Sequence, residues 1–375
     1  MNLLMVSGDR QVSIGERGPF DSMQQEFSKH FNRIDVLCPN PGKPQTVQTM
    51  HGNVHLHVAP CGRLGTARWI VSKGSDLIKE HNHGAITSHD YGWFYNGLGS
   101  AKLSSRTGVP YLSEIHHVPG YPYAADWREH RDRIIARAYM RFARRRAAAF
   151  RVVNHKQMPD LLLRWGVPAA KIMVLPSVYL DLRVFCPSEP APEKIYDLCF
   201  VGRMVSNKGI PHVLRALEIL KGRDQDYSIV LVGRGPERER WQAQARGLGV
   251  RATWIEWVDR PEDLAQIYSQ SRVVVCASSC EGGPRFTVEA MACGTPVVST
   301  PVGVMGDLLA DGRCGRLTGF DAWSMASALS ECLVDEGVRL VMGREAARAA
   351  LPYERARAIA IYADGVKALA AMRKS

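Results

Sequence analysis

Short apolar runs alternate with longer amphipathic segments through the first half of the chain. The runs are rich in Val, Ile and Leu and predict strands, whereas the segments repeat apolar residues at helical spacing. The expected strands are residues 3–7, 33–37, 54–58, 85–88 and 111–115, and the expected helices are 22–30, 66–80 and 97–107. Repeated strand–helix units of this length imply right-handed crossovers and a parallel sheet.

A proline-rich stretch then divides the chain. Prolines cluster between Pro176 and Pro192, which predicts a linker. Beyond it, strands are expected at 197–201, 228–232, 253–257, 273–276 and 297–298, and helices at 211–221, 261–269 and 286–293. Because 375 residues exceed one ordinary core, the pattern predicts an α/β protein of two domains, each with its own parallel sheet.

The composition is that of a soluble globular protein, with 46% hydrophobic and 23% charged residues. No apolar run approaches the ~18–20 residues of a membrane span. The apolar residues 1–6 lack the basic flank and cleavage site of a signal peptide. The 9 cysteines are scattered without a C-x-x-C pair, so we expect reduced thiols in a cytoplasmic protein, with neither disulfides nor a metal site.

The net charge of +11 predicts an anionic partner, because nucleic acid, anionic membranes and phosphorylated substrates all attract such a surface. The excess is concentrated in residues 127–151, which are expected to form a helix with a basic face beside an apolar stripe. The basic residues are Arg133, Arg137, Arg141, Arg144 and Arg145, and the apolar ones are Ile134, Ile135, Ala138, Tyr139 and Phe142. Two interpretations stay open, a solvated arginine face on a core helix and a surface that docks onto an anionic membrane. Nucleic acid is not expected, because no aromatic-interleaved or zinc-finger pattern accompanies these residues.

Two glutamates stand in an apolar, glycine-rich segment that follows the expected strand 273–276. Glu281 lies in the loop at the end of that strand, and Glu289 lies within the next helix. In open α/β sheets, ligands bind in the crevice beyond the carboxyl ends of the strands. Because a carboxylate cannot be buried there without a partner, a hydroxyl-rich ligand is a natural candidate.

Residues 279–296 resemble the E-x7-E signature of retaining glycosyltransferases of the GT-B fold (glycosyltransferase family 4, glycosyl transferases group 1). Three further blocks match this family in order along the chain: residues 200–203 with 207–209, residues 231–235, and residues 300–303 before 311–312. The resemblance covers most of the chain and is strongest from residue 197 to residue 317.

The resemblance implies two Rossmann-like domains that face a cleft. Residues 1–183 would form the acceptor domain, residues 194–352 the nucleotide-sugar-binding domain, and residues 353–375 a helix that returns to the first domain. It also implies a hexosyltransferase that uses a nucleotide-diphosphate sugar, such as a UDP- or GDP-sugar, and no metal or other cofactor. The acceptor would be a glycan or a lipid-linked compound in glycan, polysaccharide or glycolipid biosynthesis, and the protein could work as a peripheral protein at the inner membrane face.

The family's donor-site roles fall on matching positions of this sequence. Arg203 and Lys208 would neutralise the leaving diphosphate, Glu281 would meet the transferred sugar, and Glu289 would accept hydrogen bonds from the ribose. The other expected donor-site residues are Gly202, Gly233, Gly282, Gly283, Pro284 and Arg285. The alternatives are two surface cations at a turn and a carboxylate that only caps its helix.

In the first domain, His116 matches the catalytic-site histidine that lines the cleft near the donor sugar. His117 stands where many relatives carry an aspartate, so the choice between the two histidines stays open. Gly15 corresponds to the glycine loop that contacts the donor phosphates, although the usual paired glycines are separated here. His89 and Asp90 are candidates for acceptor binding, with a structural role as the equal alternative.

The family mechanism is front-face substitution, in which the acceptor hydroxyl enters on the face that the diphosphate leaves and the leaving oxygen takes its proton. Two alternatives remain. A nucleotide-sugar epimerase of the same fold would need additional acid–base residues, and a non-catalytic GT-B interaction protein would be expected to lack Glu281, Lys208 or Arg203, which are all present. A dinucleotide oxidoreductase is disfavoured because no G-x-G-x-x-G follows the first strand.

Overall fold

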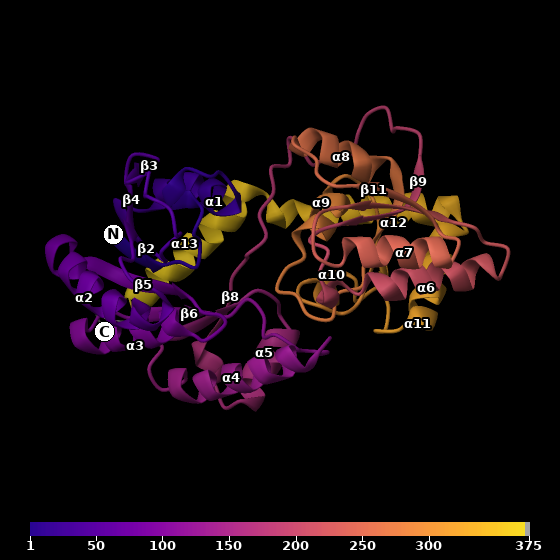
Figure 1. The fold of residues 1–375 in the computed structure, drawn as a ribbon. Helices are drawn as coiled ribbons and strands as arrows, with labels where there is room; N and C mark the ends of the chain where they lie inside the picture. Colours follow the sequence, from indigo (N-terminus) through magenta and orange to yellow (C-terminus); the bar gives the residue numbers. More distant parts are fainter. Residues whose placement is uncertain (372–375) are drawn as a thin grey trace. The chain divides into compact units, whose positions relative to one another are not determined.

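The computed structural model describes residues 1–371, which divide into two compact α/β units (Figure 1). The first unit contains Met1–Val118, Arg131–Pro176 and the chain from Ala356 onward, and the second contains Pro119–His130 and Ser177–Arg355. Two α/β domains with parallel sheets are therefore confirmed. The units differ from the expected ranges 1–183, 194–352 and 353–375, because residues 119–130 and 177–183 pack with the second unit.

The first unit is built on an eight-stranded sheet with the order β3-β4-β2-β1-β5-β6-β7-β8. Neighbouring strands are parallel, except that β3 is antiparallel to β4. The strands are β1 (Asn2–Val6), β2 (Arg33–Cys38), β3 (Thr49–Met50), β4 (Val54–Val58), β5 (His83–His89), β6 (Tyr111–Glu114), β7 (Ala149–Val152) and β8 (Ile172–Val174). The chain leaves β1 toward β2 on one side and later returns to β5 on the other, so the carboxyl ends of β1 and β5 form a topological switch point.

Helices cover both faces of this sheet. Ser88 of β5 is hydrogen-bonded to Ser100 of α3, whereas the neighbouring Thr87 is hydrogen-bonded to Tyr362 of α13. Because successive side chains of a strand point to opposite faces of the sheet, α3 and α13 lie on opposite faces. The helices are α1 (Pro19–Phe27), α2 (Arg63–His81), α3 (Tyr95–Thr107), α4 (Trp127–Ala143), α5 (Gln157–Arg164) and α13 (Arg355–Ala371), with short 3-10 helices η1 (Val12–Ile14), η2 (Ser28–His30) and η3 (Ala169–Lys171).

The C-terminal helix α13 completes the core of the first unit, and Figure 1 shows it beside α1 and β2. Tyr362 is buried and stacks on Phe27, with ring centroids 4.7 Å apart. Its hydroxyl donates to Glu114 of β6, which also pairs with Arg151 of β7 at 3.1 Å. Burial and the adjacent Glu114 carboxylate raise the pKa of Tyr362 well above its usual value. The helix therefore belongs to the first unit, as expected for a segment that returns to it.

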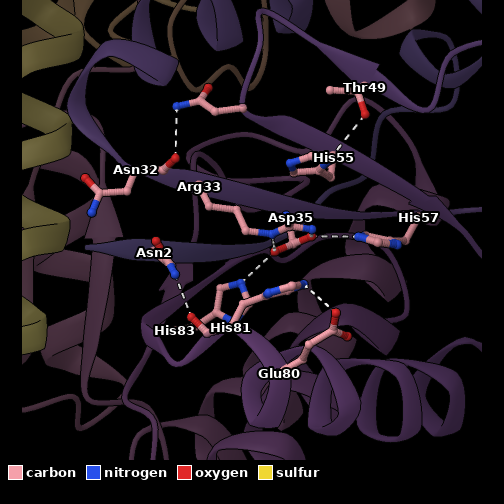
Figure 2. A network of polar contacts seen from close by, with 11 residues as sticks. Asn2, Asn32, Arg33, Asp35, Thr49, His55, His57, Glu80, His81 and His83 are labelled. Carbon is pink, nitrogen blue, oxygen red and sulfur yellow. Dashed lines mark hydrogen bonds and ion pairs between the residues drawn. The ribbon is translucent and has the colours of Figure 1, made fainter.

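A buried polar network lies at the start of β2, seen from close by in Figure 2. Asp35 is fully buried and accepts hydrogen bonds from Arg33, His57 and His83 at 2.7, 2.8 and 2.8 Å. Burial by itself raises the pKa of this carboxyl, but the three donors outweigh burial and hold the pKa well below its usual value. The ionised carboxylate therefore links β4 and β5 to β2.

The arginine-rich segment forms a shorter helix than residues 127–151 predict. Helix α4 ends at Ala143, and the segment then enters β7, where Arg151 is buried. Of the expected apolar stripe only Tyr139 is buried. Its ring fits against α3 because Gly97 has no side chain that would overlap it. Ile134 is 70% exposed, and Ala138 is also exposed. The buried face is instead Ala136, Tyr139, Met140 and Ala143.

The second unit is built on a six-stranded parallel sheet with the order β11-β10-β9-β12-β13-β14. Its strands are β9 (Tyr196–Val201), β10 (Ser228–Val232), β11 (Arg251–Ile255), β12 (Ser271–Cys276), β13 (Val297–Ser299) and β14 (Gly315–Leu317). The strands in the central part of this sheet are almost wholly apolar and buried. This is typical of parallel strands that are covered by helices on both faces.

Its helices lie in two layers, with α6, α7 and α11 on one face of the sheet and α8, α9 and α12 on the other (Figure 1). The helices are α6 (Ile210–Lys221), α7 (Arg238–Gly247), α8 (Pro261–Ser269), α9 (Arg285–Ala292), α10 (Met305–Leu308), α11 (Ala322–Leu333) and α12 (Glu336–Ala350), with η4 (Ser206–Lys208) and η5 (Leu351–Tyr353). Within residues 1–371, no helix combines the length and apolar character that crossing a bilayer requires.

Candidate functional site

Four loops lie side by side at the carboxyl-terminal edge of the second unit's sheet. Strands β10, β9, β12 and β13 are parallel neighbours, so the residues that follow them share one edge. Gly233 follows β10, Gly202 and Arg203 follow β9, Glu281 lies in the loop after β12, and Gly303 lies in the loop after β13. The structure thus brings together the donor-site residues that the sequence predicts for this unit.

Glycines let these loops touch. A side-chain carbon on Gly233 would lie 1.9 Å from the carbonyl oxygen of Gly202, and one on Gly303 would lie 2.1 Å from that of Gly282. The φ angles of Gly233 and Gly303 are 146° and 53°, which L side chains rarely adopt. These glycines are therefore required by the backbone packing of the edge, whatever contact they also make with a ligand.

Lys208 and Glu281 form an ion pair within this edge. Lys208 is the last residue of η4 and is 9% exposed. Its ammonium donates to Oε1 of Glu281, and the Ser278 hydroxyl donates to the same oxygen at 3.1 Å. No described residue donates to Oε2, which can therefore accept a hydrogen bond from a ligand.

Glu289 is held by two side chains on the same unit. It lies in the second turn of α9 and is 6% exposed. Arg285, one turn earlier, donates to Oε1 at 2.7 Å, and the buried hydroxyl of Tyr268 donates to Oε2 at 3.0 Å. A carboxylate that only capped the helix would bond to the first-turn N–H groups, so the capping alternative does not describe this residue. Each oxygen keeps a lone pair for a further donor.

The amino-terminal end of α9 offers backbone donors at the same edge. Gly282, Gly283 and Pro284 form the loop into the helix, and no side chain caps its first turn. The first N–H groups of a helix have no partner within the helix, and the helix dipole favours an anion beside them. This loop is therefore suited to bind phosphate or sugar oxygens.

Arg203 and Arg285 supply further positive charge. Arg203 is exposed, and its side chain makes no ion pair with any residue in the described part of the chain. Arg285 lies over the ring of Tyr179, 5.6 Å from its centroid, while it bonds to Glu289. Arg203 can therefore reorient toward an anion, whereas Arg285 is already fixed by two neighbours.

In the first unit, His116 lies directly beyond β6 against His89, with ring centroids 4.9 Å apart. Its Nε2 is buried and has no hydrogen-bond partner in the part of the chain that the structure describes. Burial, followed by the effect of His89 and Arg151, lowers the pKa of His116 well below its usual value, so the ring is neutral at pH 7. His117 is exposed. Of the two histidines, His116 carries the unsatisfied nitrogen.

Asp90 is buried and bonded to neighbouring elements of the fold rather than exposed at the surface. It is 3% exposed and accepts hydrogen bonds from Ser88 and Tyr139, each at 2.6 Å, and from Ser113. Burial raises the pKa of this carboxyl to about 7, although the three hydroxyls oppose the change. The network joins β5, β6 and α4, which favours the structural alternative for Asp90.

A cavity of about 270 Å³ opens at the topological switch point of the first unit. Arg10 and Arg63 line it beside Tyr91, Trp93 and Asn96, and none of its described lining residues is Asp or Glu. Neither arginine makes an ion pair in the described part of the chain. The cavity therefore combines two available cations with two half-exposed aromatic rings.

Gly15 ends η1 in the loop after β1, with φ 79°. The loop is tied down by hydrogen bonds from the N–H groups of Thr46 and Val47 to the Ser13 carbonyl. The left-handed backbone explains why glycine stands there, and the expected contact with donor phosphates remains a prediction.

Sequence reasoning missed two features of the second unit. Tyr268 was part of the expected helix 261–269, and its hydroxyl on an apolar face was the only signal of a polar partner. Residues 119–130 pack beside the loop that carries Glu281, where the Tyr123 N–H donates to the Ser279 carbonyl at 3.4 Å and the Tyr123 ring stacks on Phe320. No local pattern could have indicated that packing.

Among residues 1–371, no group of three His, Cys, Asp or Glu side chains is arranged to hold a metal ion.

Two family models match the chain. Residues 23–177 match the glycosyl transferase 4-like domain, and residues 183–349 match the glycosyl transferases group 1. A D-inositol 3-phosphate glycosyltransferase of Acidothermus cellulolyticus is 30% identical over 288 residues, which are 71% of this chain and 63% of that protein. The match therefore spans less than two thirds of that relative's length.

Solved structures share the fold over nearly the whole chain. Sucrose-phosphate synthase from Thermosynechococcus elongatus superposes with a TM-score of 0.79 at 19% identity, over 99% of each chain. Anabaena HepE in complex with UDP-glucose superposes with a TM-score of 0.74 at 19% identity, over 98% of this chain and 100% of that one. With one family model on each unit, the four ordered sequence blocks and this fold, the chain belongs to the GT-B glycosyltransferases of the family 4, group 1 type.

Proposed function

We propose that this protein transfers a sugar from a nucleoside-diphosphate sugar to an acceptor hydroxyl with retention of anomeric configuration. The observation that carries the proposal is the group of side chains at one sheet edge, where Lys208 pairs with Glu281 beside Arg203, Glu289 and the uncapped start of α9. The solved complex of HepE with UDP-glucose supports a nucleotide sugar as the donor.

The leaving diphosphate gains negative charge as its bond to the anomeric carbon breaks. Two cations, Lys208 and Arg203, and the dipoles of the α9 N–H groups act on this charge. They stabilise it more in the transition state than in the ground state. The acceptor oxygen forms its bond to the anomeric carbon on the same face, and its proton passes to the leaving phosphate oxygen. No side chain becomes covalently attached, and these protein groups supply the charge neutralisation.

Glu289 and Glu281 have separate roles in this proposal. Glu289 accepts hydrogen bonds from the ribose hydroxyls, which are the same in the ground state and the transition state. Glu281 holds Lys208 through Oε1 and offers Oε2 to the transferred sugar. His116, with its buried and unsatisfied Nε2, is the first unit's candidate for contact with that sugar.

The acceptor in this proposal carries a phosphate. Arg10 and Arg63 provide donors for it at the switch-point cavity, and Tyr91 and Trp93 offer rings on which a sugar can stack. The relative from Acidothermus, named for D-inositol 3-phosphate, is consistent with an acceptor of this class. A lipid-linked glycan, in which a phosphate joins lipid and sugar, meets the same requirement.

One experiment tests the reaction. The full-length protein is incubated with labelled UDP- and GDP-sugars and with phosphorylated acceptors, and the product anomer is assigned by NMR. Transfer with the donor's anomeric configuration supports the proposal, and an inverted product overturns retention. Interconversion of free nucleotide sugars would indicate the epimerase alternative, and binding of donor without any turnover would indicate an interaction protein.

A separate variant tests whether the switch-point cavity binds the acceptor. Arg63→Ala should raise the acceptor KM by at least about tenfold, the expected loss of a charged hydrogen bond, and leave donor affinity unchanged. Arg68→Ala is the matched control, because Arg68 is an exposed arginine on the same helix outside the cavity. An unchanged acceptor KM in Arg63→Ala would remove the cavity from acceptor binding while leaving the transfer reaction standing.

A further inference from the structure

A second basic cavity lies in the second unit, at the opposite edge of the sheet from Glu281. It has a volume of about 370 Å³ and is formed where β9, β12 and β13 begin rather than where they end. The six residues of β12, at about 3.3 Å each, separate the two edges by roughly 20 Å. The cavity is therefore not part of the donor site.

Five cationic side chains line this cavity, and none of its described lining residues is Asp or Glu. The cations are Lys194, Arg272, Arg339, Arg344 and Arg348. Carboxylates contact some of them from outside the cavity, since Arg272 pairs with Asp197 at 3.1 Å, Arg348 with Glu345 at 2.5 Å and Arg339 with Glu336 at 3.8 Å. Arg344 makes no ion pair in the described part of the chain.

The two innermost cations are held in place by carbonyl groups. The Lys194 ammonium donates to the carbonyls of Ser269 and Ser271 at 2.7 and 3.1 Å, and Arg339 donates to the Leu333 carbonyl at 3.2 Å. Carbonyls satisfy hydrogen bonds but carry only partial charge, so the Lys194 charge is not neutralised by them, and Arg339 has in addition only the Glu336 carboxylate at 3.8 Å. Burial lowers the pKa of each, and so do their cationic neighbours, namely Arg272 for Arg339 and Arg339 for Lys194. Positive charge is thus under-compensated in this wall, because neither Lys194 nor Arg344 pairs with a carboxylate in the described part of the chain.

The remaining wall is apolar and rigid. Proline and leucine side chains, including Pro187, Pro296 and Leu340, line it beside the cations. A side-chain carbon on Gly343 would lie 2.2 Å from the Gly294 carbonyl oxygen, so α12 and the loop after α9 are packed backbone to backbone. The space is within the range of small-molecule pockets, and guanidinium groups match phosphate oxygens in geometry.

We infer that this cavity is a second anion site, which binds a small phosphate or diphosphate ester remote from the transfer reaction. The phosphate lies among Arg339, Arg344 and Arg348, and the organic part of the ester lies against the proline and leucine side chains. The inference is independent of the proposed donor and acceptor sites.

Calorimetry with inorganic diphosphate tests the site. The background protein is the full chain with Arg63→Ala and Arg203→Ala, which weakens the two other candidate anion sites. Arg344→Ala with Arg348→Ala removes two cations from the cavity. Arg240→Ala with Arg246→Ala is the matched control, because it removes the same charge from exposed positions on α7 in the same unit.

The background protein and the control should each bind one diphosphate with affinities within about twofold, and the cavity variant should bind at least about tenfold more weakly. Leu340→Glu, which places a carboxylate at an exposed position on the wall, should give the same loss without removing a cation. Melting curves of the unliganded variants check that all are folded. Absence of binding to the background protein, or equal binding by the cavity variant and the control, would overturn the inference.

Discussion

Lys208 and Glu281 are 73 residues apart in the chain and form an ion pair at the carboxyl-terminal edge of the second sheet. Their side chains are 11% and 18% exposed, so each charge is mostly withdrawn from water and depends on the other. In the proposed reaction, the pair keeps a cation in place before the donor arrives. A preorganised charge need not be reoriented as the diphosphate leaves.

Lys208→Ala should slow transfer by about two to three orders of magnitude, because one electrostatic partner of the transition state is lost. Single-turnover rates with saturating donor measure this, and Lys221→Ala on α6 is the control for loss of a lysine from the same unit. Combining Lys208→Ala with Glu281→Gln should cost less than the sum of the two single changes, since the residues are in contact. A rate within a few-fold of wild type for Lys208→Ala would place the diphosphate elsewhere.

Glu289→Gln should weaken binding of the free nucleoside diphosphate by about tenfold or more, whereas Glu281→Gln should mainly lower the transfer rate. Ribose contacts do not change along the reaction, but contacts with the transferred sugar do. Tyr268→Phe removes one hydrogen bond to Glu289 and should cost about 1 kcal/mol of nucleotide affinity. Calorimetry decides the division of roles, and equal affinity losses in both glutamate variants would contradict it.

The exposed face of α4 suggests a third test, on membrane association. Ile134 and Ala138 lie on the side opposite the buried residues, together with Arg137 and Arg141. Each arginine near an anionic surface contributes roughly 1 kcal/mol, so Arg137→Glu with Arg141→Glu should reduce binding to phosphatidylserine-containing vesicles at least about tenfold at low salt. Co-sedimentation measures this, with the double change Arg240→Glu and Arg246→Glu as control. If wild-type protein stays in the supernatant at low salt, the membrane hypothesis is wrong and the transfer proposal is unaffected.

Asp90 should make the first unit less stable as the pH rises. Its carboxyl has a pKa of about 7 in the folded protein against 3.8 ordinarily, so between these pH values the folded state keeps a proton that the unfolded chain releases. Stability is full below about pH 4 and declines up to about pH 7, by up to about 4 kcal/mol at roughly 1.4 kcal/mol for each pKa unit. Asp90→Asn should remove this decline in urea titrations from pH 4.5 to 7.5. Asp76→Asn, at an exposed position, should keep the wild-type slope.

Asp35 should have the opposite pH dependence. Its folded-state pKa is depressed, so its contribution is present above about pH 4 and is lost as the pH falls further. Asp35→Asn leaves three donors beside a neutral amide and should cost about 3–5 kcal/mol of unfolding free energy at pH 7. Asp21→Asn breaks a partly exposed aspartate–histidine pair of 3.0 Å and should cost less than about 1 kcal/mol. Similar losses in both variants would show that the Asp35 network contributes little.

The sequence predicts the second unit better than the first. Strands β9, β10 and β12 are short apolar runs that end in glycine or a polar loop, and their periodicity agrees with their burial. The expected strand 253–257 was displaced by two residues from β11, which lies at the sheet edge and is only partly buried, so its apolar signal is weak. Strand β14 was missed because it has three residues, one of them an exposed leucine.

The arginine-rich segment was misread for a physical reason. Residues 144–148 are Arg-Arg-Arg-Ala-Ala, good helix formers without a glycine or proline, so nothing local marks the end of α4 at Ala143. Arg151 within β7 is paired with Glu114, a residue 37 positions away that no periodicity could identify. Similarly, the two glutamates were found from their motif, but Tyr268 and Ser278, which orient them, were not.

Helix α13 determines the order in which the two units can be completed during synthesis. The second unit is finished once Arg355 has been made, although it follows most of the first unit in the sequence. The first unit must wait for Tyr362, which fills the space between Phe27, Glu114 and Arg151. Until Tyr362 and the rest of α13 have been made, that side of the earlier-made sheet exposes apolar surface and the Glu114 carboxylate, and this surface of the nascent chain needs protection from aggregation.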